Sequence, residues 1–197
     1  MRAASGRLLF LLLLLPQLLS GCALINYDET EKPYMSGLVG KRFILVQDSY
    51  LIDNECTHGS WAERCLLLQV GGGMVYRADP FGSGSGLKLP VSFAEYDANP
   101  SAYADVHAFG YQKREIVSEV PKGTIITVTR VISSAWGDSG SCWTVYGVLD
   151  KQPADTSMQL GPCAFSGQGS PVWIHHAYDI GNDKPPVFDT KYLTPAP

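Results

Sequence analysis

Three groups of side chains in this sequence could do chemistry: a serine in a glycine-rich string, a pair of histidines, and the cysteines. The string is Gly137-Asp138-Ser139-Gly140-Ser141, and the pair is His175-His176. Gly, Asp and Ser are also the residues that turns select, which favours a polar hairpin tip for the string. The histidines lie in a predicted strand, where adjacent side chains point to opposite faces and cannot readily chelate one ion. No spacing to His58 or His107 supports zinc, so we predict no metal site.

The glycine-rich string resembles the Gly-Asp-Ser-Gly-Gly nucleophile loop of chymotrypsin-like serine proteases. The resemblance implies Ser139 as the nucleophile and His58 as the base, with Asp105 or Asp97 orienting the histidine. The chain departs from that family's pattern, because the last glycine is a serine and His58 lacks the flanking alanines and cysteine. Two barrels would also be cramped in a chain of this length. We therefore expect no catalytic residue, and a hydrolase acting through Ser139 remains the alternative.

The N-terminal segment has the layout of a secretory signal. Arg2 and Arg7 give a basic start, an apolar run follows from Leu8 to Leu19, and small residues precede Cys22. The run is 12 residues long and contains a proline, whereas a membrane-spanning helix needs about 20 apolar residues. The segment therefore predicts export rather than a membrane span.

The end of this segment, Leu19-Ser20-Gly21-Cys22, looks like the lipobox of bacterial lipoprotein precursors. The resemblance implies that the Cys22 sulfur carries a diacylglyceryl group, that residues 1–21 are removed, and that the new N-terminus is acylated. Several acyl chains hold a protein firmly at a bilayer, at roughly 0.8 kcal/mol per buried methylene. Ala23 stands where an aspartate commonly retains such proteins at the inner membrane, so the resemblance implies the outer membrane, facing the periplasm.

The remaining chain has the length and charge of one acidic domain. Without residues 1–21 it has 176 residues, 13 of them basic and 19 acidic, which gives a net charge of −6. This charge argues against nucleic acid as a partner. Residues 22–37 comprise the lipidated cysteine and a segment that we predict to be a tether. This segment mixes charges, a proline and a glycine and has no hydrophobic period. We expect a single β domain at 38–190 and an irregular tail at 191–197.

The other cysteines are even in number, which in an exported chain implies two disulfides. Three connectivities are possible. We favour Cys56–Cys65 and Cys142–Cys163, because each pair brackets its own local loop. A zinc site would need a close thiolate pair such as Cys-x-x-Cys, which the sequence lacks.

Aromatic residues in predicted loops are the candidates for binding a partner. Trp136 and Trp61 fall in such loops, and Asp138 shares the loop of Trp136. Exposed aromatic rings beside polar groups are typical of recognition surfaces. Trp143 lies in a predicted strand next to Cys142, so we expect it to pack near a disulfide.

The elements that must position these residues are mostly short strands. Residues 124–133 are β-branched nearly throughout and alternate as a half-buried strand does, and 142–149 reads as the antiparallel partner. Asn99-Pro100-Ser101 has the residue types of a helix N-terminus and predicts a short helix at 101–106. The other expected strands are 41–48, 65–70, 74–77, 87–93, 158–165 and 172–178.

Many short strands joined by Gly-rich turns predict an all-β fold, a small barrel or sandwich of short antiparallel strands with at most one short helix. Val120-Pro121-Lys122-Gly123-Thr124 and the strand, loop and strand that follow resemble the core of a small barrel of the Src-homology type. The match covers about thirty residues and implies no ligand.

Two classes of function follow from these patterns. The first is a lipid-anchored cell-envelope module without cofactor, which binds an envelope protein or cell-wall glycan, or inhibits an envelope enzyme through the loop Ala135–Ser141. The second is an envelope hydrolase that uses Ser139. The first depends on the anchor and the disulfides, and the second depends on the serine string alone.

Overall fold

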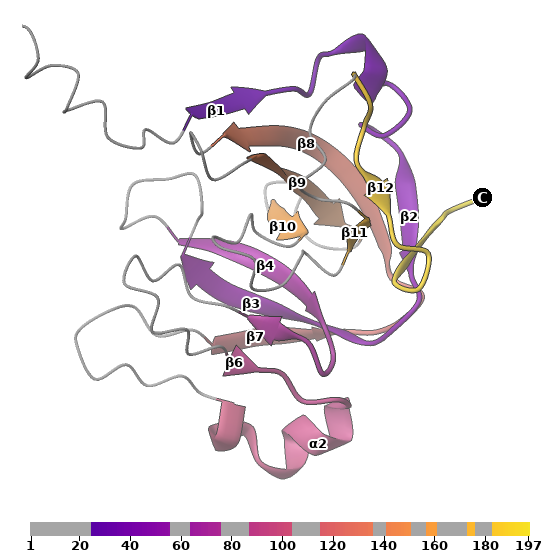
Figure 1. Ribbon diagram of the computed structural model, residues 1–197. Coiled ribbons are helices and arrows are strands. Elements are labelled where there is room, and N and C mark those ends of the chain that lie inside the picture. Colours follow the sequence, from indigo (N-terminus) through magenta and orange to yellow (C-terminus); the bar gives the residue numbers. More distant parts are fainter. Residues whose placement is uncertain are drawn as a thin grey trace, which may run out of the picture.

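The computed structural model describes residues 25–55, 64–75, 87–103, 115–135, 141–150, 157–160, 173–175 and 183–197. The fold is all-β, as the sequence predicts, and its largest sheet curls into half a barrel (Figure 1). The strands of this sheet are β1 (Ile25–Asp28), β2 (Arg42–Leu45), β3 (Ser49–Glu55), β4 (Arg64–Val70), β7 (Glu115–Val120), β8 (Ile125–Ala135), β9 (Ser141–Leu149), β10 (Met158–Leu160) and β13 (Leu193–Pro195).

Two small sheets and three short helical segments complete the described elements. β5 (Met74–Val75) pairs with β6 (Leu87–Lys88), and β11 (Ile174–His175) pairs with β12 (Val187–Phe188). The helical segments are α2 (Phe93–Ala98) and the 3-10 turns η1 (Pro33–Met35) and η2 (Pro100–Tyr103).

The strand order in the large sheet is β13-β2-β8-β9-β10-β4-β3-β7, and β1 also pairs with β8. Every described pair in it is antiparallel except β10 with β4, which run parallel. The prediction of short antiparallel strands thus holds for the described pairs of this sheet other than β10 with β4. β10 lies between β9 and β4. Because β4 and β10 are far apart in the sequence, no hairpin turn sets their relative direction.

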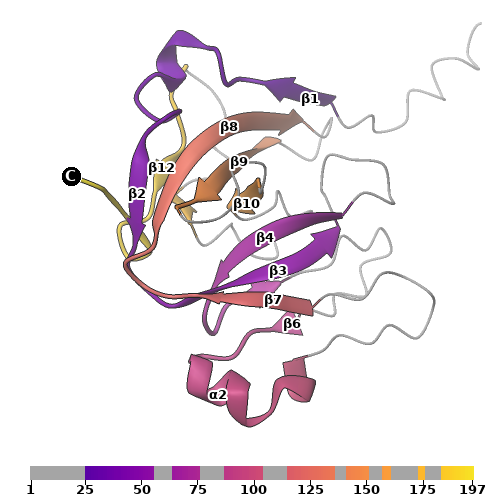
Figure 2. The same ribbon diagram turned by 180° about the vertical axis from the view of Figure 1, so that it is seen from behind.

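β8 and β9 form the long hairpin at the centre of this sheet. β8 has 11 residues and β9 has 9, and their register runs from Ile126 opposite Leu149 to Ala135 opposite Ser141. A register shift between Val128 and Arg130 marks a bulge, which increases local bending. β8 follows directly from β7 through a tight turn, so one continuous stretch of chain joins the two halves of the sheet (Figure 2).

The inner face of the curled sheet buries the main hydrophobic core. Alternate residues of the strands point inward, as the period of a strand requires. Trp173 is completely buried in this core, and its ring N–H donates a hydrogen bond to the carbonyl of Leu68 at 3.0 Å. Other fully buried members are Met35, Leu68, Ile126, Val128, Val131, Val145 and Leu160.

The segment expected to be a tether is largely part of the domain. β1 pairs with β8 over four residues, and the turn η1 brings Met35 into the core with 0% of its surface exposed. Leu38 follows it at 4% exposed. The prediction failed because a short strand and one 3-10 turn have no sustained period, although Tyr34, Met35 and Leu38 are large apolar side chains that burial stabilises.

The predicted tail at 191–197 also differs from the structure. β13 lies in it and pairs with β2, where Leu193 faces Leu45 and only 1% of Leu193 is exposed. The prolines at the end of the chain fit this place, because an edge strand tolerates residues that cannot donate to the ladder.

Residues 87–93 do not form the single strand that we expected. β6 ends at Lys88, and α2 begins after Ser92, whose hydroxyl accepts a hydrogen bond from the backbone N–H of Glu95 at 3.2 Å. Ser-x-x-Glu is a capping-box signature. The helix expected at 101–106 is the turn η2 as far as Tyr103, and 104–106 lies outside the described residues.

Candidate functional site

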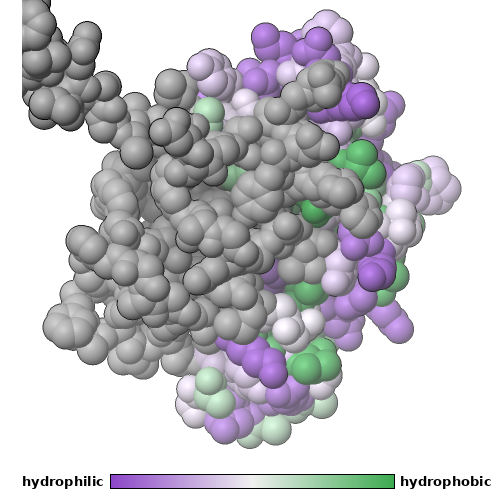
Figure 3. Space-filling view, viewed as in Figure 1, coloured by the Kyte–Doolittle hydropathy of each residue, from purple (hydrophilic) through white to green (hydrophobic). Residues whose placement is uncertain are grey.

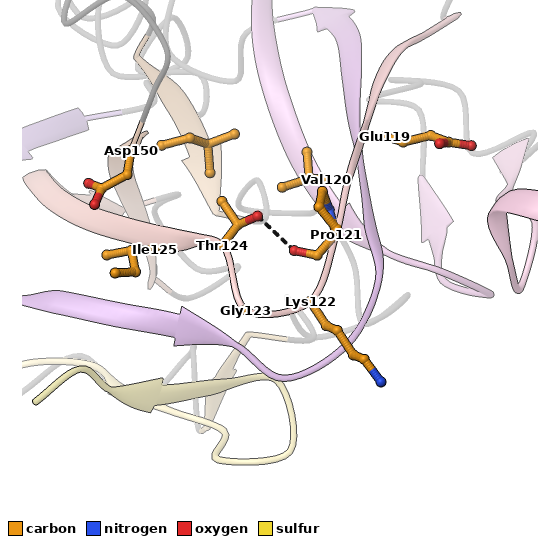
Figure 4. Close-up of a pocket in the computed structure, with 9 residues that line it drawn as sticks. Glu119, Val120, Pro121, Lys122, Gly123, Thr124, Ile125 and Asp150 are labelled. Atoms are coloured by element: carbon orange, nitrogen blue, oxygen red, sulfur yellow. Dashed lines mark hydrogen bonds between the residues drawn. The ribbon is translucent and has the colours of Figure 1, made fainter.

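The described part of the chain contains a pocket where β7 turns into β8 (Figure 4). Its volume is about 540 Å³, within the range of roughly 300–1,000 Å³ that small-ligand sites occupy. The end of β7 and the turn after it form one side, and the start of β8 and the end of β9 form the other. The lining residues are Glu119, Val120, Pro121, Lys122, Gly123, Thr124, Ile125, Leu149 and Asp150.

The turn beside the pocket is held in one conformation. The backbone N–H and the hydroxyl of Thr124 both donate to the carbonyl of Pro121, at 3.2 and 2.7 Å. Gly123 has a φ of 85°, and a glycine with positive φ at the third position is typical of a type II turn. The Asp48 carboxylate accepts the backbone N–H of Lys122 at 3.0 Å.

Two backbone hydrogen bonds attach this turn to β2. Gly123 donates its N–H to the carbonyl of Leu45 at 2.8 Å, and Leu45 donates to the carbonyl of Thr124 at 2.9 Å. The turn therefore cannot move without breaking contacts to the neighbouring strand, and one wall of the pocket is rigid.

Asp150 ends the opposite wall. Its backbone N–H donates to the carbonyl of Ile125 at 2.9 Å, and its carboxylate accepts a hydrogen bond from the Arg42 guanidinium at 2.6 Å. The two side chains of this ion pair are 50% and 38% exposed, so the pair adds little stability. It instead places a fixed pair of charges at the rim of the pocket.

The pocket has an apolar interior and a charged rim. Ile125 is partly exposed, whereas Val120 and Leu149 belong to the main core and are only 3% and 4% exposed. Lys122 and Asp150 bring opposite charges to the edge. The Glu119 side chain points away from the space between the walls, so the strand backbone alone lines the pocket at that position (Figure 4).

The described lining residues offer a hydroxyl and charged groups that can hold a ligand. The one hydroxyl of the lining belongs to Thr124 and donates to a backbone carbonyl. A nucleophile needs a base within hydrogen-bond reach, and the lining contains no histidine or cysteine. The pocket can hold an apolar side chain between groups of opposite charge.

Most of the residues that the sequence singled out lie outside the described residues. These are Cys22, Cys56, His58, Trp61, Asp105, Trp136, Asp138, Ser139 and Cys163. Asp97 is described, and it is an exposed residue of α2, unlike the buried carboxylate that orients the base of a serine protease. The Ser139 hydrolase and the binding role of the two tryptophans therefore stay predictions.

Two other singled-out residues belong to β9. Trp143 is 3% exposed and lies in the main core, so it supplies no binding surface. Cys142 is 2% exposed and is disulfide-bonded. Its pairing with Cys163 stays a prediction, since residue 163 is not among those described.

Sequence reasoning missed the pocket itself. The string Val120–Thr124 predicts a fold and no site, although its proline and glycine mark the turn that forms one wall of the pocket. The second wall comes from Leu149 and Asp150, which only the pairing of β8 with β9 brings to the same place.

Comparisons with known proteins give no relative: no family model, no curated protein and no solved structure matches this chain. Within the described ranges, no group of three or more His, Cys, Asp or Glu residues could hold a metal ion. The helices of that same part of the chain include none that is long and apolar enough to span a bilayer.

Proposed function

We propose that this protein is a bacterial lipoprotein whose β domain binds a segment of an envelope protein in the pocket between β7 and β9. The observation that carries the binding role is the pocket, with an apolar interior, a rigid turn and charged edges. The anchor is supported by the basic start, the apolar run and the Leu19–Cys22 string. Together they support a non-enzymatic module held at the outer membrane.

The lining favours a protein segment over cell-wall glycan. Sugar rings stack on exposed aromatic side chains, whereas the residues that line this pocket include no Trp, Tyr or Phe. An apolar side chain flanked by polar groups suits Ile125 and the charges of Lys122 and Asp150. An inhibitor of an envelope enzyme would be one case of such a module.

The short distance from Cys22 to β1 supports a definite orientation at the membrane. Ile25 is only three residues after Cys22, and an extended chain spans at most about 3.6 Å per residue. The start of β1 would thus lie within about 11 Å of the lipidated cysteine. Ile25 pairs with Ala135 at the end of β8, so this end of the hairpin would face the bilayer.

The pocket lies at the other end of the same strand. Ile125 and Ala135 are the two ends of β8, which has 11 residues, and a strand rises about 3.3 Å per residue. The pocket would therefore be roughly 30 Å along the strand from the anchored end. It would open away from the bilayer, where a periplasmic partner can reach it.

The strand register supports one of the two proposed disulfides. Met158 faces Gly147 and Leu160 faces Val145, so each step forward on β10 is one step back on β9. If this register continued for three more residues in each direction, it would bring Cys163 opposite Cys142. Mass spectrometry of peptides from the unreduced protein should show this link, and a different partner for Cys142 would refute it.

The anchor is tested by fractionation. Wild-type protein should sediment with the outer membrane and have an intact mass that includes acyl chains, whereas Cys22→Ser should lack the chains. Wild-type protein with an unmodified Cys22 would refute the lipoprotein proposal.

The binding role is tested by photo-cross-linking in intact cells. A photoreactive amino acid replaces Lys122 at the pocket, and the matched control replaces Lys32, an exposed lysine beside η1. We expect one envelope protein to be linked from position 122 and not from 32, and Asp150→Lys to abolish the link. Linkage to glycan instead, or equal products from both positions, would refute the proposal.

A further inference from the structure

The chain between the proposed lipidated cysteine and the domain has almost no slack. β1 begins at Ile25, three residues after Cys22, and its four residues pair with residues 132–135 of β8. The attachment continues beyond the strand, because Glu29 donates its backbone N–H to the carbonyl of Val131 at 2.9 Å. Three residues are too few for a flexible linker, so the start of the domain stays close to Cys22.

Side chains also fasten β1 to β8. The Asp28 carboxylate forms an ion pair with the Arg130 guanidinium at 2.7 Å. One carboxylate oxygen of Glu29 accepts a hydrogen bond from the Ser133 hydroxyl at 2.8 Å, and the other accepts one from the Tyr34 hydroxyl at 2.7 Å. Because these contacts join β1 to a central strand of the sheet, the direction of β1 at the membrane sets the orientation of the domain.

β1 carries an exposed aromatic ring. Tyr27 is 53% exposed, although it pairs with the buried residue Ser133 in the ladder. It lies five residues after Cys22, so the two Cα atoms are at most about 18 Å apart. Tyrosine combines an apolar ring with a polar hydroxyl, and such side chains are enriched where a membrane meets water. The proposed anchor would bring a bilayer surface within reach of this ring.

The surroundings of Tyr27 suit lipid headgroups rather than acyl chains. Its neighbours Asn26 and Asp28 are exposed, and the charge of Asp28 is balanced by that of Arg130. The described residues around β1 and η1 are mostly hydrophilic (Figure 3). Such a face would lose its hydration in the hydrocarbon core, which costs free energy. Among headgroups its polar groups keep their water, and an aromatic ring can still reach the acyl boundary.

We propose that the edge formed by β1 rests on the phospholipid surface to which Cys22 is anchored, with the Tyr27 ring among the headgroups. The inference rests on the proposed lipid anchor and goes further, because it assigns a contact surface and a lipid partner to it. One ring binds lipid weakly, but the short connection keeps it at a high effective concentration beside the bilayer. The domain therefore lies against the membrane in one orientation instead of swinging on a tether.

The first test is photo-cross-linking to lipid. Acylated protein is reconstituted in vesicles of phosphatidylethanolamine and phosphatidylglycerol, with a photoreactive phenylalanine in place of Tyr27. The matched control carries it in place of the exposed residue Lys122, beside the far end of β8. We expect about tenfold more phospholipid product from position 27 than from position 122, because only the first is held beside the bilayer. Equal yields, or no phospholipid product from position 27, would overturn the inference.

A second test leaves Tyr27 unchanged, so it does not depend on a variant that folds. Lactoperoxidase iodinates accessible tyrosine rings and is too large to reach a ring among headgroups. Mass spectrometry should show several-fold less iodine on Tyr27 in vesicles than in the unacylated chain, residues 22–197 with Cys22→Ser. Tyr103 of η2, next to α2 and away from β1 (Figure 1), is partly exposed and should react equally in both. Equal iodination of Tyr27 in both samples contradicts the proposed contact.

The intact mass of the same sample separates this inference from the proposed anchor. An unmodified Cys22 refutes the lipoprotein proposal and the membrane contact together. Acylated protein in which Tyr27 neither links to phospholipid nor is shielded from iodination overturns the contact alone, and the anchor stands.

Discussion

Gly123 offers a direct test of the turn that forms one wall of the pocket. Its φ is +85°, and a Cβ built on it would meet no atom within 4 Å. Gly123→Ala would therefore create no clash, and its whole cost would be the left-handed backbone, about 1–2 kcal/mol for an L-residue. A domain of this size loses roughly 2–4 °C of Tm per kcal/mol, so Tm should fall by about 2–8 °C.

A second glycine isolates the effect of φ. A Cβ at Gly37 also meets nothing within 4 Å, and its φ is not positive. Gly37→Ala should therefore be neutral, or stabilising by up to about 1 kcal/mol, because it restricts the unfolded chain. Gly123→Asn should cost less than Gly123→Ala, since asparagine tolerates the left-handed region better than alanine.

The assay is denaturant unfolding followed by circular dichroism, with the wild type and the three variants measured together. The expected order of stability is Gly37→Ala, wild type, Gly123→Asn, Gly123→Ala. If Gly123→Ala is as stable as Gly37→Ala, the turn does not have the conformation described. The inference that one wall of the pocket is rigid would then be refuted as well.

Three further predictions concern the core, the ladder and the acidic cluster. Met35→Ala should lower the free energy of unfolding by about 2–5 kcal/mol, because Met35 is 0% exposed, whereas Ser36→Ala at the neighbouring exposed position should change it little. A loss below about 1 kcal/mol for Met35→Ala would mean that this segment is a tether, as the sequence predicts. Gly147→Ala should destabilise by about 1–3 kcal/mol, since its Cβ would lie 2.8 Å from a methyl group of Ile126; an unchanged midpoint would contradict the β8–β9 register. The raised pKa of Glu119 means that the folded state keeps a proton that the unfolded state loses, so stability falls as pH rises from about 4.5 through the raised pKa. Glu119→Gln should flatten that part of the stability–pH curve, and an unaltered slope would show that Glu119 is not the titrating group.

The parts of the fold that could be predicted are those with a strong local pattern. β8 and β9 are long, β-branched and joined by turn residues, so their sequence alone indicates a hairpin. β3 and β7 were missed because neither shows a clean alternation: consecutive residues of β3, from Ser49 to Ile52, are buried on both faces, and β7 has an exposed valine, Val117. Their pairing is also set by contacts that are distant in the sequence. The capping box at Ser92 was a local signal for α2 that the apolar residues around it obscured.

The candidate site was less predictable than the fold. The turn is formed by consecutive residues and can be predicted locally. The pocket also needs Asp150, which forms an ion pair with Arg42 on a strand more than a hundred residues earlier. The pairing of Tyr50 with Glu119 is equally non-local, and it depends on a register that shifts between Leu51 and Ile52. A one-residue slip would turn either side chain to the opposite face.

The strand that leads into the pocket separates two faces of the sheet. Glu119 and Val120 are consecutive in β7 and point to opposite faces, one toward α2 and one toward the core. β7 is the last strand in the order of the sheet, and the turn follows it at once. A partner segment in the pocket would therefore lie against this turn.

This geometry separates stability from binding. Gly40 has a φ of 77°, and a Cβ built on it also meets nothing within 4 Å, but Gly40 does not line the pocket. Gly40→Ala and Gly123→Ala should therefore lose similar stability, since both force alanine into the left-handed region. Only Gly123→Ala should also reduce the cross-link from Lys122, because only that change alters the surface over which the partner passes. Equal losses of the cross-link in both variants would mean that the turn is structural and that the partner binds elsewhere.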